Sequence, residues 1–301
     1  MAMRILMTGG TGLIGRRVCT ALIAVGHDVT VLSRCPETVK EKCGNQVTPM
    51  ATLNEWSDEQ PFDAVINLAG EPIVDARWTD KRKQLLIKSR IGVTVDLVDK
   101  IAQLKHKPSV MLSGSAIGYY GDSGDVAIDE ASPVAHDFSA QLCSEWEAAA
   151  GKVTASGTRL CLLRTGLVLA ANGGVLHKML LPFKLALGTR LGGGRQWMSW
   201  IHIDDYVAIV LTLLADKEAS GAYNMTAPKP VSNAEFTRTL ASVLNRPALF
   251  VAPTWLLRAA MGEMSVLLLG GQRVLPQRVL AMGYSFRFPE LKTALGALLI
   301  A

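Results

Sequence analysis

The chain has 301 residues, of which 49% are hydrophobic and 19% are charged, and its formal net charge is +5 at pH 7. This balance argues against a disordered chain, and the length suffices for one large domain or a domain with an appendage. Lysine and arginine are scattered rather than grouped in blocks, so we expect no nucleic-acid partner.

The five cysteines form no closely spaced pair, which favours reduced thiols and predicts no metal site. The N-terminal apolar run is short and ends in glycines, unlike a signal peptide. The longest apolar stretch, Trp255 to Gly270, is interrupted by Arg258 and Glu263 and falls short of the roughly 20 residues that cross a bilayer. We therefore expect a cytoplasmic protein without a membrane partner.

The first half of the chain alternates predicted strands and helices. MRILMTGG predicts a buried strand that runs into a glycine loop, and helical spacing of apolar residues follows from Arg17 to Val25. HDVTVLSR predicts a second strand ending at Ser33 and Arg34, which closes a βαβ unit. Further strands are expected at 63–70, 109–116 and 159–169, with helices at 81–104 and 140–150. The alternation predicts an α/β fold with a Rossmann-type doubly wound parallel sheet.

The rhythm changes after about residue 170, which indicates a smaller, mostly helical C-terminal lobe. AYNMTAP could return one strand to the sheet, and Ser232 with Glu235 has the spacing of a helix capping box. From Arg246 onward the pattern is helical, and the last helix is expected to begin at Pro289. We expect a dinucleotide-binding domain at 1–170 with a strand return near 220–228, substrate-lobe segments at 171–245 and a helical domain at 246–301.

The loop GGTGLIG has Gly10, Gly12 and Gly15 in GxGxxG spacing, between a predicted strand and a predicted helix. Glycine permits a tight turn and a close approach of the backbone to a pyrophosphate, and the helix N-terminus favours negative charge. The loop therefore predicts a dinucleotide site. At the end of the second strand, where a carboxylate would select NAD, Ser33 and Arg34 stand instead, and an arginine there can pair with a 2′-phosphate. The sequence predicts NADP(H) as the cofactor.

The segments TGGTGLIG, NLAG, SGSAIGYYG, RTGLVL and WIHIDD resemble the extended short-chain dehydrogenase/reductase superfamily over most of the chain. More narrowly, the chain is similar to its atypical epimerase family of unknown substrate, in which a segment like LGTRLGGGRQWMSWIHIDD recurs with a C-terminal domain of unknown function. The resemblance implies a fold and a cofactor more firmly than a reaction.

The resemblance also implies positions for the cofactor. The glycine loop would hold the pyrophosphate, Ser33 and Arg34 the 2′-phosphate, and Val168 would lie near the nicotinamide. Arg90 could reach the cofactor or be a solvated helix charge. The full set of implied cofactor residues is Gly9, Gly10, Thr11, Gly12, Leu13, Ile14, Gly15, Ser33, Arg34, Leu68, Ala69, Gly70, Arg90 and Val168.

Catalysis in this superfamily normally uses a Tyr-x-x-x-Lys pair, and that pair is missing. The corresponding helix offers Cys143 and Glu147 at the same separation, but a thiol and a carboxylate cannot reproduce a phenol and an ammonium. Cys143 is predicted to be a small buried hydrophobe rather than a reactive thiol.

Four hydroxyl groups remain as candidates for catalysis. Ser113 and Ser115 match the position of the superfamily's substrate-orienting serine, and Tyr119 and Tyr120 follow directly. Tyr120 also matches a structural tyrosine of the superfamily, so a packed aromatic is an equal alternative for it.

A second cluster lies around residue 200. Trp197, Met198 and Trp200 indicate either an aromatic-walled pocket or core packing between lobes. His202 is predicted to be a structural hydrogen-bonding residue. Asp204 and Asp205 are predicted to cap the following helix.

Two functions stay open at this level. One is an NADP(H)-dependent oxidoreductase or epimerase acting on an unidentified small molecule. The other is a non-catalytic NADP(H)-sensing protein that binds a partner. Some relatives of this group are described as cell-division inhibitors, which suggests a role in cell-division control. Either would be a monomer or a homodimer.

Overall fold

The computed structural model describes residues 2–300. Its centre is a sheet of seven strands in the order β12-β7-β5-β4-β1-β2-β3, and every neighbouring pair is parallel. The strands are β1 (Arg4–Thr8), β2 (Asp28–Leu32), β3 (Thr48–Met50), β4 (Ala64–Asn67), β5 (Val110–Ala116), β7 (Arg159–Thr165) and β12 (Gly221–Met225). The doubly wound sheet and the late strand return are confirmed.

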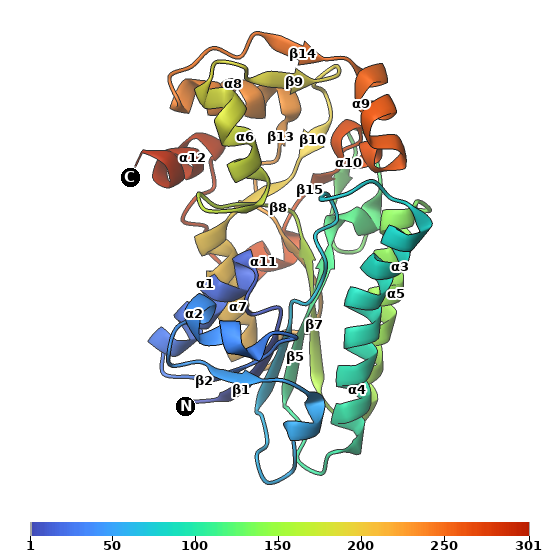
Figure 1. Cartoon of the computed structure of the whole chain (residues 1–301), viewed down its shortest axis with the longest axis vertical. Coiled ribbons are helices and arrows are strands. Elements are labelled where there is room, and N and C mark those ends of the chain that lie inside the picture. The colour runs from blue at the N-terminus through green and yellow to red at the C-terminus, as the bar shows by residue number, and fades with distance from the viewer. Residues whose placement is uncertain (1, 301) are drawn as a thin grey trace.

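Helices cover both faces of this sheet (Figure 1). One face carries α1 (Leu13–Ala24), α2 (Val39–Cys43), α7 (Ile203–Ala215) and the short α11 (Gln277–Ala281). The other face carries α4 (Val93–Gln103) and α5 (Phe138–Gly151). Helix α3 (Asp80–Ile87) continues into α4 through a π-helical turn at Lys88–Gly92.

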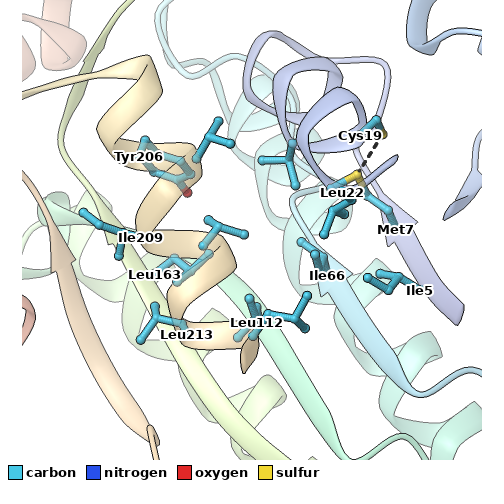
Figure 2. Packing of buried hydrophobic residues seen from close by; sticks show 14 of the residues in the cluster. Ile5, Met7, Cys19, Leu22, Ile66, Leu112, Leu163, Tyr206, Ile209 and Leu213 are labelled. Atoms are coloured by element: carbon cyan, nitrogen blue, oxygen red, sulfur yellow. Dashed lines mark hydrogen bonds between the residues drawn. The ribbon is translucent and has the colours of Figure 1, made fainter. Parts of the chain in front are cut away.

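The buried strands alternate their side chains between two apolar layers. Figure 2 shows the first layer, in which Ile5 and Met7 of β1 pack with Cys19 and Leu22 of α1. The same layer continues to Tyr206 of α7, which lies at the other side of the view. The second layer joins Leu6, Val65 and Met111 of the strands to Leu97 and Ile101 of α4. Because both faces are covered, the strands form continuous apolar runs in the sequence.

A second region lies above the carboxyl ends of the strands in Figure 1. Its helices are α6 (Gly174–Lys184), α8 (Asn233–Val243), α9 (Thr254–Met261), α10 (Val266–Leu269) and α12 (Leu291–Leu299). Four two-stranded pairs tie it together: β11 (Trp200–His202) with β8 (Leu167–Leu169), β14 (Phe250–Ala252) with β9 (Thr189–Leu191), β10 (Trp197–Met198) with β13 (Val231–Ser232), and β15 (Arg273–Val274) with β6 (Ala127–Ile128).

Several details differ from the sequence prediction, and one is that the segment from Arg246 onward, predicted to be helical, also contains the strands β14 and β15. The segment 159–169 forms two strands rather than one, broken at Gly166, where a Cβ would lie 2.5 Å from the Ser199 carbonyl oxygen. The edge strand β3 was not predicted, because it is three residues long and contains Pro49. The last helix begins at Leu291 rather than at Pro289. None of the helices within residues 2–300 has both the length and the apolarity that a bilayer span requires.

Candidate functional site

The glycine loop connects β1 to α1 at the carboxyl edge of the sheet. Gly9 adopts a φ of 69°, and a Cβ on it would lie 2.3 Å from the Leu68 carbonyl oxygen. A Cβ on Gly15 would lie 2.2 Å from the Gly9 carbonyl oxygen, which itself accepts a hydrogen bond from the Gly12 N–H at 3.0 Å. Side chains are therefore excluded at Gly9 and Gly15 by the turn itself and by its packing on the end of β4.

The N-terminus of α1 is free of side-chain caps. Gly12 is the N-cap residue, and within residues 2–300 no side chain accepts the N–H groups of the first turn. The first turn carries no acidic residue. These N–H groups have no partner within an α-helix, and the positive end of the helix dipole adds to their attraction for an anion. The loop therefore has the donors and the open backbone that a pyrophosphate requires.

Arg34 stands at the end of β2, beside the loop. Its side chain is 86% exposed, and its Nη2 lies 3.1 Å from Oε1 of Glu71, which follows the end of β4. The Ser33 N–H donates to the Met50 carbonyl oxygen, and the Ser33 hydroxyl accepts from the Cys35 N–H at 3.1 Å. Glu71 thus orients an exposed guanidinium whose other N–H groups are available to a ligand.

The segment after β4 is held by Arg90, which lies in the π-helical turn. Arg90 Nη2 donates to the Glu71 carbonyl oxygen at 2.8 Å, and a Cβ on Gly70 would lie 3.1 Å from Arg90 Cζ. Burial lowers the pKa of the Arg90 guanidinium from its usual value. The structure therefore places Arg90 against Gly70 and Glu71 as a half-buried residue, and not as a freely solvated helix charge.

Val168 lies on β8, and the connection that follows it returns to the glycine loop. A Cβ on Gly173 would lie 2.9 Å from Leu13 Cδ1, and a Cβ on Gly174 would lie 3.6 Å from the Val168 carbonyl oxygen. Because β1, β2 and β4 are parallel neighbours, their carboxyl ends meet at one edge. The structure brings the predicted cofactor residues together along that edge.

The two candidate serines lie inside the protein on β5. Ser113 has no exposed surface, and its hydroxyl accepts from Asn67 Nδ2 at 3.4 Å. Ser115 is 3% exposed and donates to Glu147 Oε1 at 2.6 Å. Both hydroxyls are therefore engaged with neighbouring side chains.

Glu147 and Arg164 form the centre of a buried polar cluster. Arg164 Nε donates to Glu147 Oε1 at 2.8 Å and Nη2 donates to Oε2 at 2.9 Å. Burial disfavours the charge on Arg164, but the hydrogen bonds and charge of Glu147 outweigh it, so the pKa of Arg164 lies above its ordinary value. The pair is a bidentate salt bridge between α5 and β7.

The two candidate tyrosines border this cluster. Tyr120 is 3% exposed, donates to Asn224 Oδ1 at 2.7 Å and accepts from Arg164 Nη1 at 2.8 Å. Burial raises the pKa of Tyr120 to about 12, against the lowering effect of Arg164. Tyr119 is half-buried, with its ring 3.7 Å from Arg164 Cζ. The structure gives Tyr120 the packed, hydrogen-bonded setting of a structural aromatic.

Cys143 and Glu147 occupy one side of α5, at the separation of the missing Tyr-x-x-x-Lys pair. Cys143 is 4% exposed, and burial raises the pKa of its thiol to about 12. The thiol is thus protonated at neutral pH and behaves as the buried hydrophobe that was predicted. Glu147 is committed to Arg164. Within residues 2–300 no group of three His, Cys, Asp or Glu side chains is placed to hold a metal ion.

The aromatic cluster near residue 200 divides between two roles. Trp200 is fully buried in the upper core, where its Nε1 donates to the Lys229 carbonyl oxygen at 3.1 Å. Trp197 is half-buried, donates to Asp125 Oδ1 at 2.8 Å and stacks with Arg273 at 5.0 Å. Of the two predicted roles, an aromatic-walled pocket or core packing, the structure shows core packing for Trp200.

The prediction that Asp204 and Asp205 cap α7 is wrong. His202, not either aspartate, is the N-cap, with Nδ1 accepting from the Asp204 N–H at 3.1 Å, which confirms its structural hydrogen bond. Helix α7 begins at Ile203, so both aspartates lie within its first turn and not before it. Asp204 instead pairs with Arg17, and Asp205 accepts from Tyr284 and from two backbone N–H groups of the C-terminal segment.

Two features of the site were not predicted. Glu71 directly follows the strand-end NLAG. A single acidic residue after a strand does not indicate which basic residue it will pair with. The sequence did contain an indication of the Glu147–Arg164 pair. Arg164 lies in an otherwise apolar strand, and a buried charge requires a partner.

Comparisons with known proteins agree with this geometry. Residues 5–226 match the family described as NAD dependent epimerase/dehydratase family, and residues 252–298 match a domain of unknown function, DUF1731. The chain is 39% identical over 303 residues to the epimerase family protein SDR39U1 homolog, chloroplastic, of Arabidopsis thaliana, covering 99% of this chain and 87% of that protein.

Two solved structures extend the comparison. The crystal structure of human epimerase family protein SDR39U1 (isoform2) with NADPH is 37% identical, with a TM-score of 0.89 over 98% of this chain and 99% of that chain. UDP-glucuronic acid 4-epimerase from Bacillus cereus in complex with NAD has a TM-score of 0.77 at 17% identity, over 98% of this chain and 97% of that chain, and shares the fold. This chain therefore belongs to the NAD dependent epimerase/dehydratase family, and its residues 252–298 match the domain of unknown function DUF1731.

Proposed function

We propose that this protein binds NADP(H) along the carboxyl edge of its central sheet. The observation that carries the proposal is the glycine loop, which leaves the N-terminus of α1 bare of caps and of acidic side chains. The loop would hold the pyrophosphate through the backbone of Gly12, Leu13 and Ile14. The NADPH in the crystal structure of human SDR39U1, a protein 37% identical to this chain, supports the same assignment.

The preference for NADP(H) over NAD(H) rests on the end of β2. Arg34 provides an exposed guanidinium at the position where the resemblance places the 2′-phosphate, and an arginine can bind phosphate through two N–H groups at once. Ser33 adds a hydroxyl beside it. The NAD-bound epimerase of Bacillus cereus shares only 17% identity, so it supports the fold and does not decide the cofactor.

We propose further that the protein is an oxidoreductase or epimerase acting on a small molecule. Bound NADP(H) would supply hydride transfer, and the chain must supply substrate orientation and a proton donor. Among the four candidate hydroxyls, those of Ser113, Ser115 and Tyr120 are tied to neighbouring side chains. Tyr119 has no side-chain hydrogen bond to another residue within 2–300, so its phenol is our candidate for moving the proton. With reduced thiols and NADP(H), we expect the protein in the cytoplasm.

A substrate screen tests this reaction class. Purified protein is incubated with NADPH and sugar nucleotides, aldehydes or quinones, and the absorbance of the reduced nicotinamide is followed. For a substrate that turns over, Tyr119→Phe should lower kcat by about 10²-fold or more while NADPH binding stays unchanged. Turnover that Tyr119→Phe leaves intact would remove Tyr119 from the mechanism.

A second candidate function is favoured by the Glu147–Arg164 pair. These residues occupy the region where the family's acid–base pair would act, and their polar groups satisfy one another. A non-catalytic protein that senses NADP(H) and binds a partner would need no free acid or base there. Under this function, NADPH binds, no substrate turns over, and partner capture depends on NADPH. A pull-down that yields the same partners from Arg34→Glu would contradict sensing.

A further inference from the structure

A cavity of about 610 Å³ lies beside α1, on the flank that faces α7 and the C-terminal segment. Its walls come from α1, the connection after β8, the start of α7 and the last helix α12. Of the residues that we assign to the cofactor, Leu13 alone lines it. Its volume is in the range of small-molecule sites, and the proposed reaction makes no use of it.

Three arginines give the cavity a positive character. Arg16 and Arg17 project from α1, and Arg287 approaches from the segment before α12. Asp204 pairs with Arg17, while no carboxylate of residues 2–300 forms an ion pair with Arg16 or Arg287. The cavity thus holds an excess of two guanidinium groups over carboxylates, which favours an anion.

His202 lies in the same wall. Its side chain is 3% exposed, and Nδ1 accepts the Asp204 N–H, so the ring proton of the neutral imidazole is on Nε2. Nε2 is buried and has no hydrogen-bond partner among residues 2–300. The His202 side chain lines the cavity, but Nε2 itself is covered by protein and does not contact a ligand there.

Thr20 and Asn172 add polar groups to the lining, and the wall beside His202 is apolar. Phe288 stacks on His202 with ring centroids 3.9 Å apart, and Arg287 lies 5.2 Å from the Phe288 ring. Ile203, Ala297 and Leu298 complete an apolar wall next to these rings. Inorganic anions gain nothing from such a wall, whereas a molecule with both an acidic group and an apolar body would use the whole cavity.

We infer that this cavity is a second ligand site, separate from the proposed cofactor crevice, that binds a small amphipathic anion with a phosphate or carboxylate group and an apolar body. The arginines hold the acidic group, and the wall formed by Phe288, Ala297 and Leu298 buries the apolar body. The site joins the helix of the glycine loop to the C-terminal domain through one ligand.

The test is isothermal titration of the full chain with octyl phosphate as the probe. Inorganic phosphate supplies the charge alone and 1-octanol supplies the apolar body alone, so each should bind at least about tenfold more weakly than octyl phosphate. Nonanoate, which carries a carboxylate on the same octyl chain, replaces octyl phosphate to show which of the two acidic groups the site prefers.

Two variants locate the binding. Ala297→Trp fills the cavity from an exposed position of α12, and Arg287→Glu reverses one charge; each should weaken octyl phosphate at least about tenfold. The exposed Arg238→Glu on α8 and Arg34→Glu in the cofactor crevice are controls that should leave the affinity unchanged. Circular dichroism checks that each variant is folded.

The proposal is overturned if octyl phosphate does not bind. It is also overturned if octyl phosphate binds equally well to folded Ala297→Trp and Arg287→Glu proteins. Weakening by Arg34→Glu instead would place the probe in the cofactor crevice and would likewise contradict a second site.

Discussion

Arg164 and Glu147 meet in the interior as a bidentate pair, 2.8 and 2.9 Å between their hydrogen-bonded atoms, with side chains 6% and 10% exposed. The pair joins β7 to α5, and it also orders Ser115 and Tyr120 around it. Removing one partner would leave a buried charge without compensation. A single Arg164→Met or Glu147→Gln should therefore cost about 3–5 kcal/mol of the free energy of unfolding.

The double variant separates the pair from its parts. If the loss comes from the uncompensated charge, Glu147→Gln combined with Arg164→Met should be more stable than the sum of the single losses predicts. Urea unfolding of the four proteins measures this coupling. Strict additivity would mean that the pair contributes no mutual stabilisation.

Gly9 and Gly12 should respond differently to a methyl group. Gly9→Ala places a Cβ 2.3 Å from the Leu68 carbonyl oxygen at a φ of 69°, so we expect destabilisation of about 1–3 kcal/mol or more. A Cβ on Gly12 lies 3.2 Å from the Gly9 carbonyl oxygen at a φ of −76°, which costs much less. Gly12→Ala should leave the thermal unfolding temperature nearly unchanged but block NADPH at the N-terminus of α1. Normal NADPH affinity in Gly12→Ala would place the pyrophosphate elsewhere.

Asp205 anchors the C-terminal segment to α7. Its buried carboxylate accepts from the Tyr284 hydroxyl at 2.9 Å and from the Arg287 and Phe288 N–H groups at 2.8 and 2.9 Å. An amide cannot accept all three bonds, so Asp205→Asn should cost about 1.5–3 kcal/mol and increase hydrogen exchange in α12. Asp204→Asn is the matched control, since its partner Arg17 is exposed and the pair is worth about 1 kcal/mol at most. Equal losses in the two variants would disprove the anchoring role.

His202 predicts a pH dependence of stability. Burial lowers the pKa of His202 below its ordinary value of 6.5, in spite of the nearby Asp204 and Asp205 carboxylates, while Arg287 and Arg17 add to the lowering. The unfolded chain then binds a proton more readily than the folded one. The contribution of His202 to the free energy of unfolding is fully present above pH 6.5 and is lost as the pH falls through the folded pKa. The free energy of unfolding then changes by at most about 1.4 kcal/mol per pH unit.

The comparison variant for this titration is His202→Asn, whose side-chain oxygen can still accept the Asp204 N–H. Urea midpoints measured from pH 8 to pH 5 should fall more steeply for the unaltered protein than for His202→Asn. Parallel curves would show that His202 does not contribute to acid sensitivity.

Local sequence patterns were sufficient for the parallel sheet and the glycine loop. The apolar runs from Arg4 to Thr8 and from Val110 to Ala116 are buried on both faces, and Gly9 to Gly15 directly follow the first of them. Such signals lie within a few consecutive residues, so one sequence contains them. The division of 159–169 at Gly166 depends on the approach of Ser199, a contact distant in sequence.

The polar connections of the site could not be predicted for the same reason. Arg34 and Glu71 are 37 residues apart, and Asp205 and Phe288 are 83 apart. Each of these residues is ordinary by itself, and its role depends on which segment the fold brings against it. The cap of α7 shows the limit clearly, because two aspartates at a helix start predict a cap, yet one is drawn to Arg17 and the other to the C-terminal segment.

The central claim is that the glycine loop and Arg34 hold NADP(H), and the dissociation constants of NADPH and NADH for the unaltered protein and for Arg34→Ala test it most directly. We predict that the unaltered protein binds NADPH about tenfold or more tightly than NADH. Arg34→Ala should weaken NADPH by about tenfold, the effect of one solvent-exposed charge-assisted contact, and change NADH by no more than about twofold. Equal affinity of the unaltered protein for the two cofactors, or an unchanged NADPH affinity in Arg34→Ala, would contradict the account.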